Sequence, residues 1–209
     1  MEMKFRYFTK LAGINLKHNF LPHLLAALAV VLLTPIVFEI FSLDEKLAAQ
    51  PLEMLLSLVG VVLLVPIFFP EQDENIKDLI RSKKTDYLSV CILRIIYSAF
   101  TLFLIMGSFI IIMAAGESKV TVEHFIGTAA SALFLGALGF LTAGISGNTT
   151  VGYMTSMIYY IINFAVKDKL GKFYLFSMTQ GSFTEKYWLL GASVIMIITT
   201  FLYLKIREQ

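Results

Sequence analysis

Six long runs of apolar residues, separated by polar connections, dominate the pattern along this chain. The runs cover residues 20–41, 52–69, 87–115, 122–145, 149–166 and 187–206. An α-helix needs about 20 apolar residues to cross the hydrocarbon core of a bilayer, and the runs are close to that length or longer. We therefore predict an all-α membrane protein, built as a single six-helix transmembrane domain over residues 1–209.

Composition supports the same class of protein. Hydrophobic residues make up 57% of the 209 residues, and charged residues make up only 15%. A soluble domain of this size could not bury so much apolar surface, so the lipid bilayer is the expected surrounding. The net charge of +2 gives no indication of a nucleic-acid partner. The single cysteine, Cys91, excludes an internal disulfide.

Residues 1–18 differ from the six runs because they combine basic and apolar positions. Arg6, Lys10 and Lys17 fall on one side of a helical wheel, while Phe5 and Phe8 fall elsewhere. This pattern predicts an amphipathic helix that lies in the headgroup layer. The alternative is an extension that only anchors the first span.

The distribution of lysine and arginine predicts the orientation. One side of a six-span chain would carry Lys4, Arg6, Lys10, Lys17, Lys77, Arg81, Lys83, Lys84, Arg94, Lys205 and Arg207. The other side would carry Lys46, Lys119, Lys167, Lys169, Lys172 and Lys186. The first side is richer, so we expect both termini in the cytoplasm. Residues 167–186 then form a long extracellular loop, which is partly apolar and could re-enter the membrane.

A charged block, PEQDENIKDLIRSKK, separates the second and third apolar runs. Its acidic residues come first and its basic residues last, an order that complements the dipole of a helix. Ile76, Leu79 and Ile80 form a narrow apolar stripe with helical spacing. We predict a short cytoplasmic helix within residues 70–86. So short a helix is marginal in water and needs a packing partner, either the protein's own helix ends or a soluble subunit. Residues expected at this surface are Glu71, Asp73, Glu74, Ile76, Lys77, Asp78, Leu79, Ile80 and Arg81.

The segment PIFFPEQDENIKDLIRSKKTDYLSVCILRIIYS resembles the region between the second and third spans of permease subunits of type-2 ABC exporters. Those permeases share a Pro-Glu step, here Pro70-Glu71, then a helix of the form found at residues 76–83, and an arginine placed like Arg94. The resemblance covers the whole chain in layout but only this segment as a motif. Compact bacterial members of this family lack a large outer domain, as this chain does, so the bacterial plasma (inner) membrane is the implied location.

The resemblance implies a mechanism in which the charged block is a coupling helix. It would dock into a cytoplasmic ATP-binding subunit, present in two copies, and the chain would pair with a second permease subunit of the same or a related kind. No GxxxxGK[ST] motif occurs here, so ATP and magnesium would be bound by the partner and no cofactor by this chain. The implied cargo is a small amphiphile, a peptide or a drug-like molecule.

Charged residues inside apolar runs are costly and are often functional. Arg94 lies two turns into the third run, where it could snorkel to the headgroups or pair with an acidic group near the coupling helix. Glu39 lies near the outer end of the first run, where it could be hydrated or form part of an outer gate. His23 lies at the cytoplasmic start of that run, where it could serve as an interfacial anchor.

A polar stripe runs along the fifth apolar run. Asn148, Gly152, Thr155, Tyr159 and Asn163 recur every three or four residues and so share one face of a helix. Such a stripe must face other helices or a water-filled path rather than lipid. Packing through hydrogen bonds is one interpretation, and a translocation path lined by Asn148, Thr155, Tyr159 and Asn163 is the other.

The fourth apolar run carries small residues at the same spacing, namely Ala132, Gly136, Gly139, Ala143 and Gly147. Small residues let two helices approach closely, so we predict close helix packing along this face.

Two other functional classes have different sequence requirements. A self-sufficient secondary transporter or channel-like protein would favour internal repeats or a carboxylate near the middle of the membrane, and the sequence indicates neither. An enzyme within the membrane would need a catalytic set, but HExxH, GxSxG and similar motifs are absent, as is a His/Cys/Asp cluster that would suggest a metal site. The sequence therefore predicts a transporter subunit without enzymatic activity of its own.

Overall fold

The computed structural model describes residues 19–72 and 87–207, and within these ranges the regular structure is entirely helical. The elements are α2 (Leu21–Val37), α3 (Glu45–Met54), η2 (Leu56–Leu58), α4 (Val59–Leu64), η3 (Val65–Gln72), α6 (Tyr87–Ala115), α7 (Val122–Ser146), α8 (Thr149–Val166), η4 (Lys167–Phe173), η5 (Met178–Gln180) and α9 (Thr184–Arg207). The predicted interfacial helix over residues 1–18 lies outside the described residues, as does most of the charged block, residues 73–86.

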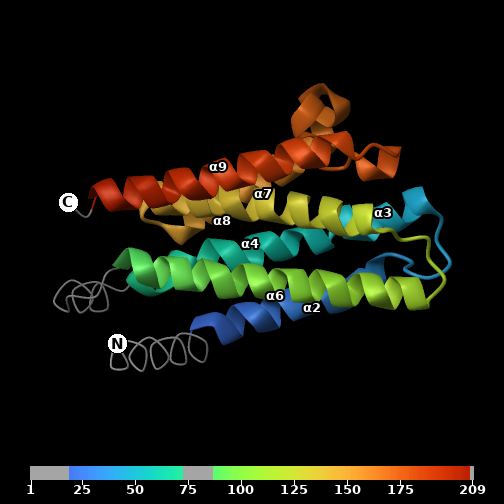
Figure 1. Cartoon of the computed structure of the whole chain (residues 1–209), viewed down its shortest axis with the longest axis horizontal. Helices are drawn as coiled ribbons and strands as arrows, with labels where there is room; N and C mark the ends of the chain where they lie inside the picture. The colour runs from blue at the N-terminus through green and yellow to red at the C-terminus, as the bar shows by residue number, and fades with distance from the viewer. Residues whose placement is uncertain (1–18, 73–86, 208–209) are drawn as a thin grey trace.

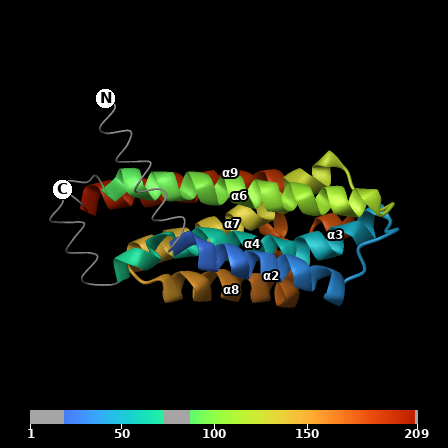
Figure 2. The ribbon, with the colours of Figure 1, turned by 90° about the horizontal axis from the view of Figure 1, so that it is seen from below.

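The long helices lie side by side along one axis (Figures 1 and 2). The start of α2, the end of η3, the start of α6, the α7–α8 turn and the end of α9 lie together at one end of the bundle, here called the terminal end. Residues 38–44, 116–121 and 174–183 lie at the other end, here called the loop end.

Four helical stretches of the described chain are long and apolar enough to cross a membrane: Glu45–Pro70, Tyr87–Ala115, Val122–Ser146 and Thr184–Arg207. The shorter helix α2 is also apolar, and α8 has 18 residues but includes several polar ones. These helices are compatible with a multi-pass membrane protein. The prediction of an all-helical fold with apolar helices is confirmed for the described residues, while the count of six spans stays a prediction.

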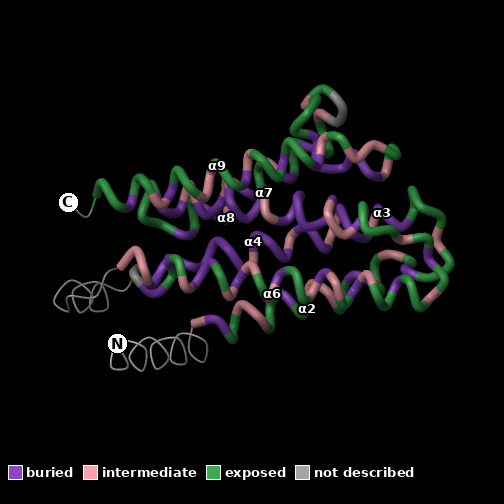
Figure 3. Tube along the Cα trace, in the orientation of Figure 1, coloured by how far each residue is buried: buried purple, intermediate pink, exposed green. Residues whose placement is uncertain are grey.

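Two of the four long stretches form the centre of the bundle. Within the most apolar part of each stretch, 72% of residues are buried in Glu45–Pro70 and 67% in Val122–Ser146, against 28% in Tyr87–Ala115 and 22% in Thr184–Arg207. Figure 3 shows the same contrast between α4 and α7 inside and the more exposed α9 and α2 outside. The exposed faces of α6 and α9 are nevertheless apolar, as expected for surfaces that lipid or another membrane helix covers.

Small residues bring α7 into close contact with its neighbours, as the sequence predicted. A Cβ added at Gly60 of α4 would lie 1.9 Å from the carbonyl oxygen of Ala132, and one at Gly136 would lie 2.5 Å from the carbonyl oxygen of Gly60. A Cβ added at Gly152 of α8 would lie 2.5 Å from the carbonyl oxygen of Gly139. Only glycine fits at these crossings, because the two backbones touch without any side chain between them.

The first predicted span, residues 20–41, is longer than the helix that forms. Helix α2 ends at Val37, and Phe38 is extended. The reason is a competing set of hydrogen bonds at the loop end: the Ser118 hydroxyl donates to the carbonyl of Ile40 at 2.8 Å and accepts from the amide of Leu43 at 3.1 Å. These bonds tie residues 40–43 to the turn after α6, so a continuous helix to residue 41 is excluded.

The second predicted span began at residue 52, but the helix begins at Glu45. Asp44 precedes it in an extended conformation, and Glu45 supplies an acidic first turn that favours a helix start. The α-helix is interrupted after Met54 by η2 and again after Leu64 by η3, near Pro66 and Pro70. Residues 45–51, which mix polar and apolar side chains, are therefore part of the helical stretch rather than a connection, and Glu53 lies inside the bundle.

Candidate functional site

The segment between α8 and α9 folds back onto the loop end of the bundle, and its residues 174–178 are buried there. Leu175, Phe176 and Met178 are each at most 2% exposed. Leu175 and Phe176 pack with Phe134 of α7 and Leu189 of α9 in one apolar cluster. The sequence predicted that residues 167–186 form an extracellular loop. The structure describes a segment whose middle, residues 174–178, is buried, while residues on either side of it are partly or fully exposed.

A buried ion pair lies beneath this segment. The Lys186 ammonium of α9 is 2.6 Å from a carboxylate oxygen of Glu53 on α3, and the two side chains are 1% and 0% exposed. The same ammonium donates to the Ser131 hydroxyl at 2.7 Å and to the carbonyl of Leu175. A buried charge is stable only when it is paired and hydrogen-bonded, and both conditions are met for this lysine.

The Glu53 carboxylate also holds the backbone of the segment. One oxygen accepts from the amide of Met178 at 2.8 Å, and the other accepts from the amide of Thr179 at 3.1 Å. These two amides begin η5, where backbone N–H groups have no partner within the helix. A single carboxylate therefore joins three elements: α3, on which it lies, α9 through Lys186, and η5.

Side chains of α8 hold the same segment from another direction. The amide of Leu175 donates to the side-chain oxygen of Asn163 at 2.8 Å, and the Tyr159 hydroxyl donates to the carbonyl of Phe173 at 2.6 Å. The Tyr160 hydroxyl donates to the carbonyl of Met54. That carbonyl lacks its usual helical partner, because the amide of Leu58 donates to Leu55 where α3 gives way to η2.

Together these groups form what we call the loop-end cluster: Glu53, Ser131, Tyr159, Asn163 and Lys186, with the backbone of residues 173–179. Its side chains come from α3, α7, α8 and α9. The cluster can fix the buried segment against the helix ends, and breaking it would require several buried polar groups to find new partners at once. The described residues contain no group of three His, Cys, Asp or Glu side chains that could hold a metal ion.

The residues of the predicted polar stripe on α8 lie in different surroundings. Asn163 and Gly152 are buried, Tyr159 and Thr155 are partly exposed, and Asn148 is exposed at the α7–α8 turn. The Thr155 hydroxyl donates to the carbonyl of Val151 in its own helix at 2.8 Å, and the Asn148 side chain accepts from the amide of Thr150. The structure thus brings Tyr159 and Asn163 together at the loop-end cluster but does not bring Asn148 or Thr155 there. The translocation path stays a prediction.

Arg94 lies at the terminal end and does not snorkel. Arg94 is only 4% exposed. Its guanidinium donates a hydrogen bond to the carbonyl of Ile67 at 2.8 Å. In a 3₁₀-helix this carbonyl would accept from residue 70, which is a proline without an N–H group. Arg94 therefore satisfies a carbonyl that Pro70 leaves open, and it joins α6 to η3.

Two other polar residues of the predicted spans occupy the surroundings expected of helix ends. Glu39 is exposed in the 38–44 connection. His23 is partly exposed, and its ring meets the edge of Phe69 with 5.9 Å between centroids. An anchoring position for His23 and a hydrated position for Glu39 are both consistent with these contacts, while a role for Glu39 in a gate stays untested.

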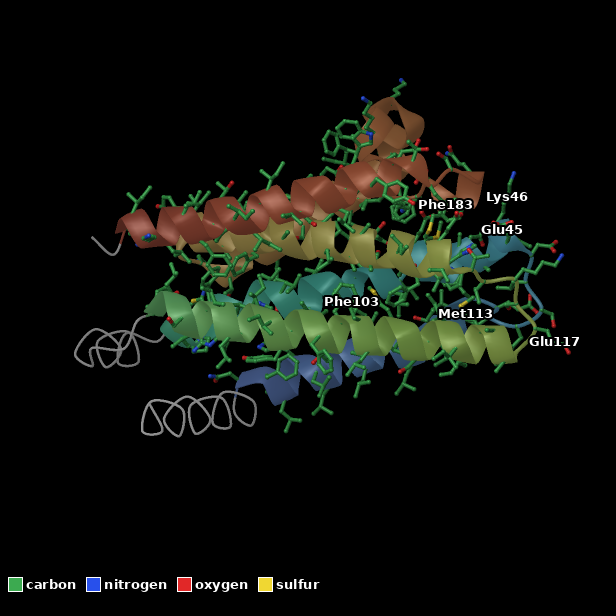
Figure 4. The ribbon with its side chains drawn as sticks, viewed as in Figure 1. Glu45, Lys46, Phe103, Met113, Glu117 and Phe183 are labelled. Atoms are coloured by element: carbon green, nitrogen blue, oxygen red, sulfur yellow. The ribbon has the colours of Figure 1, made fainter. Side chains whose placement is uncertain are left out.

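Sequence reasoning missed three polar residues at the loop end, namely Glu53, Lys186 and His124. His124 is fully buried in the first turn of α7, where its Nδ1 accepts from the amide of Thr121 at 3.2 Å. Its Nε2 therefore carries the proton and donates to the carbonyl of Glu45 at 2.9 Å, and its ring meets the edge of Phe183. Figure 4 shows Glu45 and Phe183 at the same end of the bundle as Glu117. One feature of the sequence could have indicated the ion pair: Glu53 and Lys186 carry opposite charges, and both lie at the predicted outer ends of their spans.

The residues of the predicted docking surface, from Asp73 to Arg81, lie outside the described residues, so the structure does not bear on them. Comparison with protein families, with curated proteins and with solved structures gave no match for this chain.

Proposed function

We propose that this chain is the transmembrane subunit of an ATP-driven exporter. Two cytoplasmic ATP-binding subunits would supply ATP, magnesium and hydrolysis, and a second transmembrane subunit, identical or related, would complete the path. The cargo class that suits the proposal is a small amphiphile, a peptide or a drug-like molecule. The sequence resemblance at residues 66–98 and the apolar helical bundle both support it.

The observation that carries the proposal is the hydrogen bond from Arg94 to Ile67. The two elements that it joins, η3 and α6, are those that flank the charged block of residues 70–86. A block that docks on an ATP-binding subunit must pass its movement to the membrane helices, and a buried link between its two flanking helices would make them move together. Residue Pro70 creates the need for this link by removing a backbone donor.

The loop-end cluster fits the same proposal at the opposite end of the bundle. An exporter must open on the side where the cargo leaves, and the buried residues 174–178 cover the helix ends there. In the proposed cycle this closed arrangement is one state, and opening would separate elements that Glu53 and Lys186 hold together. The energy for such a change would come from closure of the ATP-binding subunits.

Glu53 is also the observation that favours a second candidate, an ion-coupled secondary transporter. A buried carboxylate within an apolar helical stretch is a common feature of proton and sodium pathways. Here the carboxylate is already paired with Lys186, and its remaining bonds go to backbone amides at the loop end. The exporter remains the better supported function because the charged block has no role in the alternative.

Co-purification tests the exporter directly. The tagged chain is expressed in its source cells, extracted in mild detergent and examined for a protein that carries a GxxxxGK[ST] motif, and ATP turnover is then measured in membranes. The proposal expects such a subunit in the complex. It also expects Leu79→Asp to reduce the yield of this subunit severely, because burying one such apolar side chain is worth about 1.5–3 kcal/mol.

The matched control is Glu39→Gln, which changes an exposed residue of the 38–44 connection and should leave the complex intact. A chain that purifies without any ATP-binding subunit, or a Leu79→Asp variant with normal complex and turnover, would refute the proposal. Transport that continues without ATP but stops when the proton gradient is collapsed would establish the secondary transporter.

A further inference from the structure

A group of exposed aromatic and basic side chains lies where η4 meets the first turns of α9. Trp188, Tyr187 and Phe173 are 49%, 62% and 43% exposed. The Lys172 ammonium lies 4.3 Å from the centroid of the Trp188 ring, as in a cation–π contact, and Lys169 is exposed nearby in η4. We call these five residues the aromatic-basic surface.

This surface continues an exposed apolar face of α9. Trp188, Ile195, Ile198 and Leu202 follow one another at spacings of seven, three and four residues, which places them on one side of the helix. All of them are about half exposed or more, and only 22% of the most apolar part of α9 is buried. In a membrane this face must be covered by lipid chains or by another apolar helix. The aromatic-basic surface lies at the start of α9, which is the end of that face where a helix that crosses the membrane would meet the headgroups.

The chemistry of the surface identifies the kind of partner that it fits. Tryptophan and tyrosine concentrate at the boundary between hydrocarbon and headgroups, because each has an apolar ring and a polar group. Lysines next to that boundary attract anionic lipid, and their long stems let the ammonium reach the phosphates. Here the Lys172 ammonium lies over the Trp188 ring, so the lysine and the tryptophan would meet the same part of a lipid.

We infer that Lys169, Lys172, Tyr187 and Trp188 form a binding surface for the headgroups of anionic phospholipids in the leaflet at the loop end. The surface favours lipid over a second copy of the chain. A two-fold contact centred here would bring together the same lysines from both copies, and like charges in a contact are unfavourable. This inference depends on the membrane character of the chain and not on the exporter function.

The chain contains a single tryptophan, Trp188, so its fluorescence reports on this surface alone. The full-length protein is placed in nanodiscs of phosphatidylcholine in which a fixed fraction of the lipid is replaced. The replacement is either dibromo-phosphatidylcholine or dibromo-phosphatidylglycerol, whose bromine atoms quench tryptophan on contact. We expect phosphatidylglycerol to quench Trp188 more strongly, with a local enrichment of about fivefold for each lysine that engages a headgroup.

Two further measurements identify the cause of this preference. High salt should reduce it, because screening weakens attraction between exposed charges. The double variant Lys169→Gln/Lys172→Gln should abolish it, while Lys119→Gln, which removes an exposed lysine from the 116–121 turn, should leave it unchanged. The ratio of quenching by the two lipids is compared, so any direct effect of Lys172 on Trp188 emission cancels.

Equal quenching by the two brominated lipids in the wild-type protein would overturn the inference, because the surface would then contact lipid without selecting its charge. Absence of quenching by either lipid would also overturn it and would indicate that another protein chain covers Trp188. A preference that survives the double lysine variant would show that the selectivity comes from elsewhere.

Discussion

At the residue scale, the most costly feature of this molecule is the buried pair of Glu53 and Lys186. Each charge is stabilised by the other and by additional hydrogen bonds. Each is therefore needed to compensate the cost of burying the other. Removing one partner of a buried pair typically costs about 3–5 kcal/mol, because the remaining charge is left without compensation. The packing of α3, α9 and η5 at the loop end therefore depends on both members of the pair.

We predict that Glu53→Gln and Lys186→Met each lower the free energy of unfolding by about 3–5 kcal/mol, and that the double variant loses much less than the sum. The reason is that the double variant removes both charges and leaves neither buried alone. Unfolding of the purified protein in mixed detergent micelles measures all four free energies of this cycle. Additive losses in the double variant would show that the two charges act independently.

Asn163 allows the two interpretations of the polar stripe on α8 to be separated. Asn163→Leu leaves the buried amide of Leu175 without an acceptor, which should cost about 1–3 kcal/mol of unfolding free energy. Thr155→Val should change stability by no more than about 0.5 kcal/mol, because its partly exposed hydroxyl bonds only within its own helix. The same unfolding assay checks both values.

A transport assay on the same two variants completes this test. If the stripe serves packing, activity should fall only for Asn163→Leu and in proportion to the loss of folded protein. If both variants lose transport while the amount of folded protein is unchanged, the stripe lines a path and the packing interpretation is wrong.

At the element scale, the stripe of small residues on α7 sets how closely the central helices approach. The crossings at Gly60–Ala132 and Gly139–Gly152 leave no space for a methyl group. Without a hydrophobic driving force between helices in lipid, such close contact is a main source of association. The packing of α4 and α8 on α7 therefore depends on these glycines.

We predict that Gly60→Ala destabilises the protein by about 1–3 kcal/mol, because the new methyl would overlap the backbone of α7 and force a shift. The matched control is Gly191→Ala in α9, where no atom lies within 4 Å of the added carbon. That change should be neutral or should stabilise the helix by up to about 1 kcal/mol through its higher helix propensity. The thermal unfolding midpoint of Gly60→Ala should therefore fall. That of Gly191→Ala should stay the same or rise. Equal midpoints would contradict the proposed crossing.

The sequence predicted the helices well where one periodic pattern decides the outcome. The apolar runs became helices, and the stripe on α7 became a packing face, because both depend on local spacing. The pattern failed where distant backbone groups decide. Helix α2 ends early because Ser118 binds residues 40 and 43, and Glu53 is buried because Lys186 and η5 reach it from far along the chain. The same reason explains why the loop-end cluster was not predicted although the stripe that contributes Tyr159 and Asn163 was.

At the scale of the whole molecule, the arrangement of ends constrains the topology. The start of α2 and the end of α9 lie together at the terminal end with the residues that flank the charged block. If every long helical stretch crosses the membrane, all of these lie on one side of it, and the excess of lysine and arginine predicts that this side is the cytoplasm. Helix α8 is the element of this scheme that a labelling experiment must test, because its polar residues keep it out of the four most apolar stretches.

Single cysteines can decide whether α8 crosses the membrane. Cys91 is fully buried and is replaced by serine to give a background without cysteine. New cysteines are then placed at three exposed lysines of the 45–46, 116–121 and 167–173 regions, Lys46, Lys119 and Lys169, and at exposed positions near the terminal end, Asn148 and Lys205. An impermeant maleimide added to intact cells reports which of the five are outside.

We predict that Lys46→Cys, Lys119→Cys and Lys169→Cys react in intact cells, and that Asn148→Cys and Lys205→Cys react only after the membrane is opened. Each comparison tests one helix: Lys119 against Asn148 tests α7, Asn148 against Lys169 tests α8, and Lys169 against Lys205 tests α9.

The decisive position is Asn148. If it reacts from outside together with Lys119 and Lys169, then neither α7 nor α8 crosses the membrane, and the six-span topology is wrong. If Asn148 is protected while Lys169 reacts, then α8 crosses the membrane. The polar face of α8 is turned toward α7 and toward the buried residues at the loop end, where Gly152 touches α7 and Asn163 binds the amide of Leu175. These contacts explain how so polar a helix is kept within the membrane.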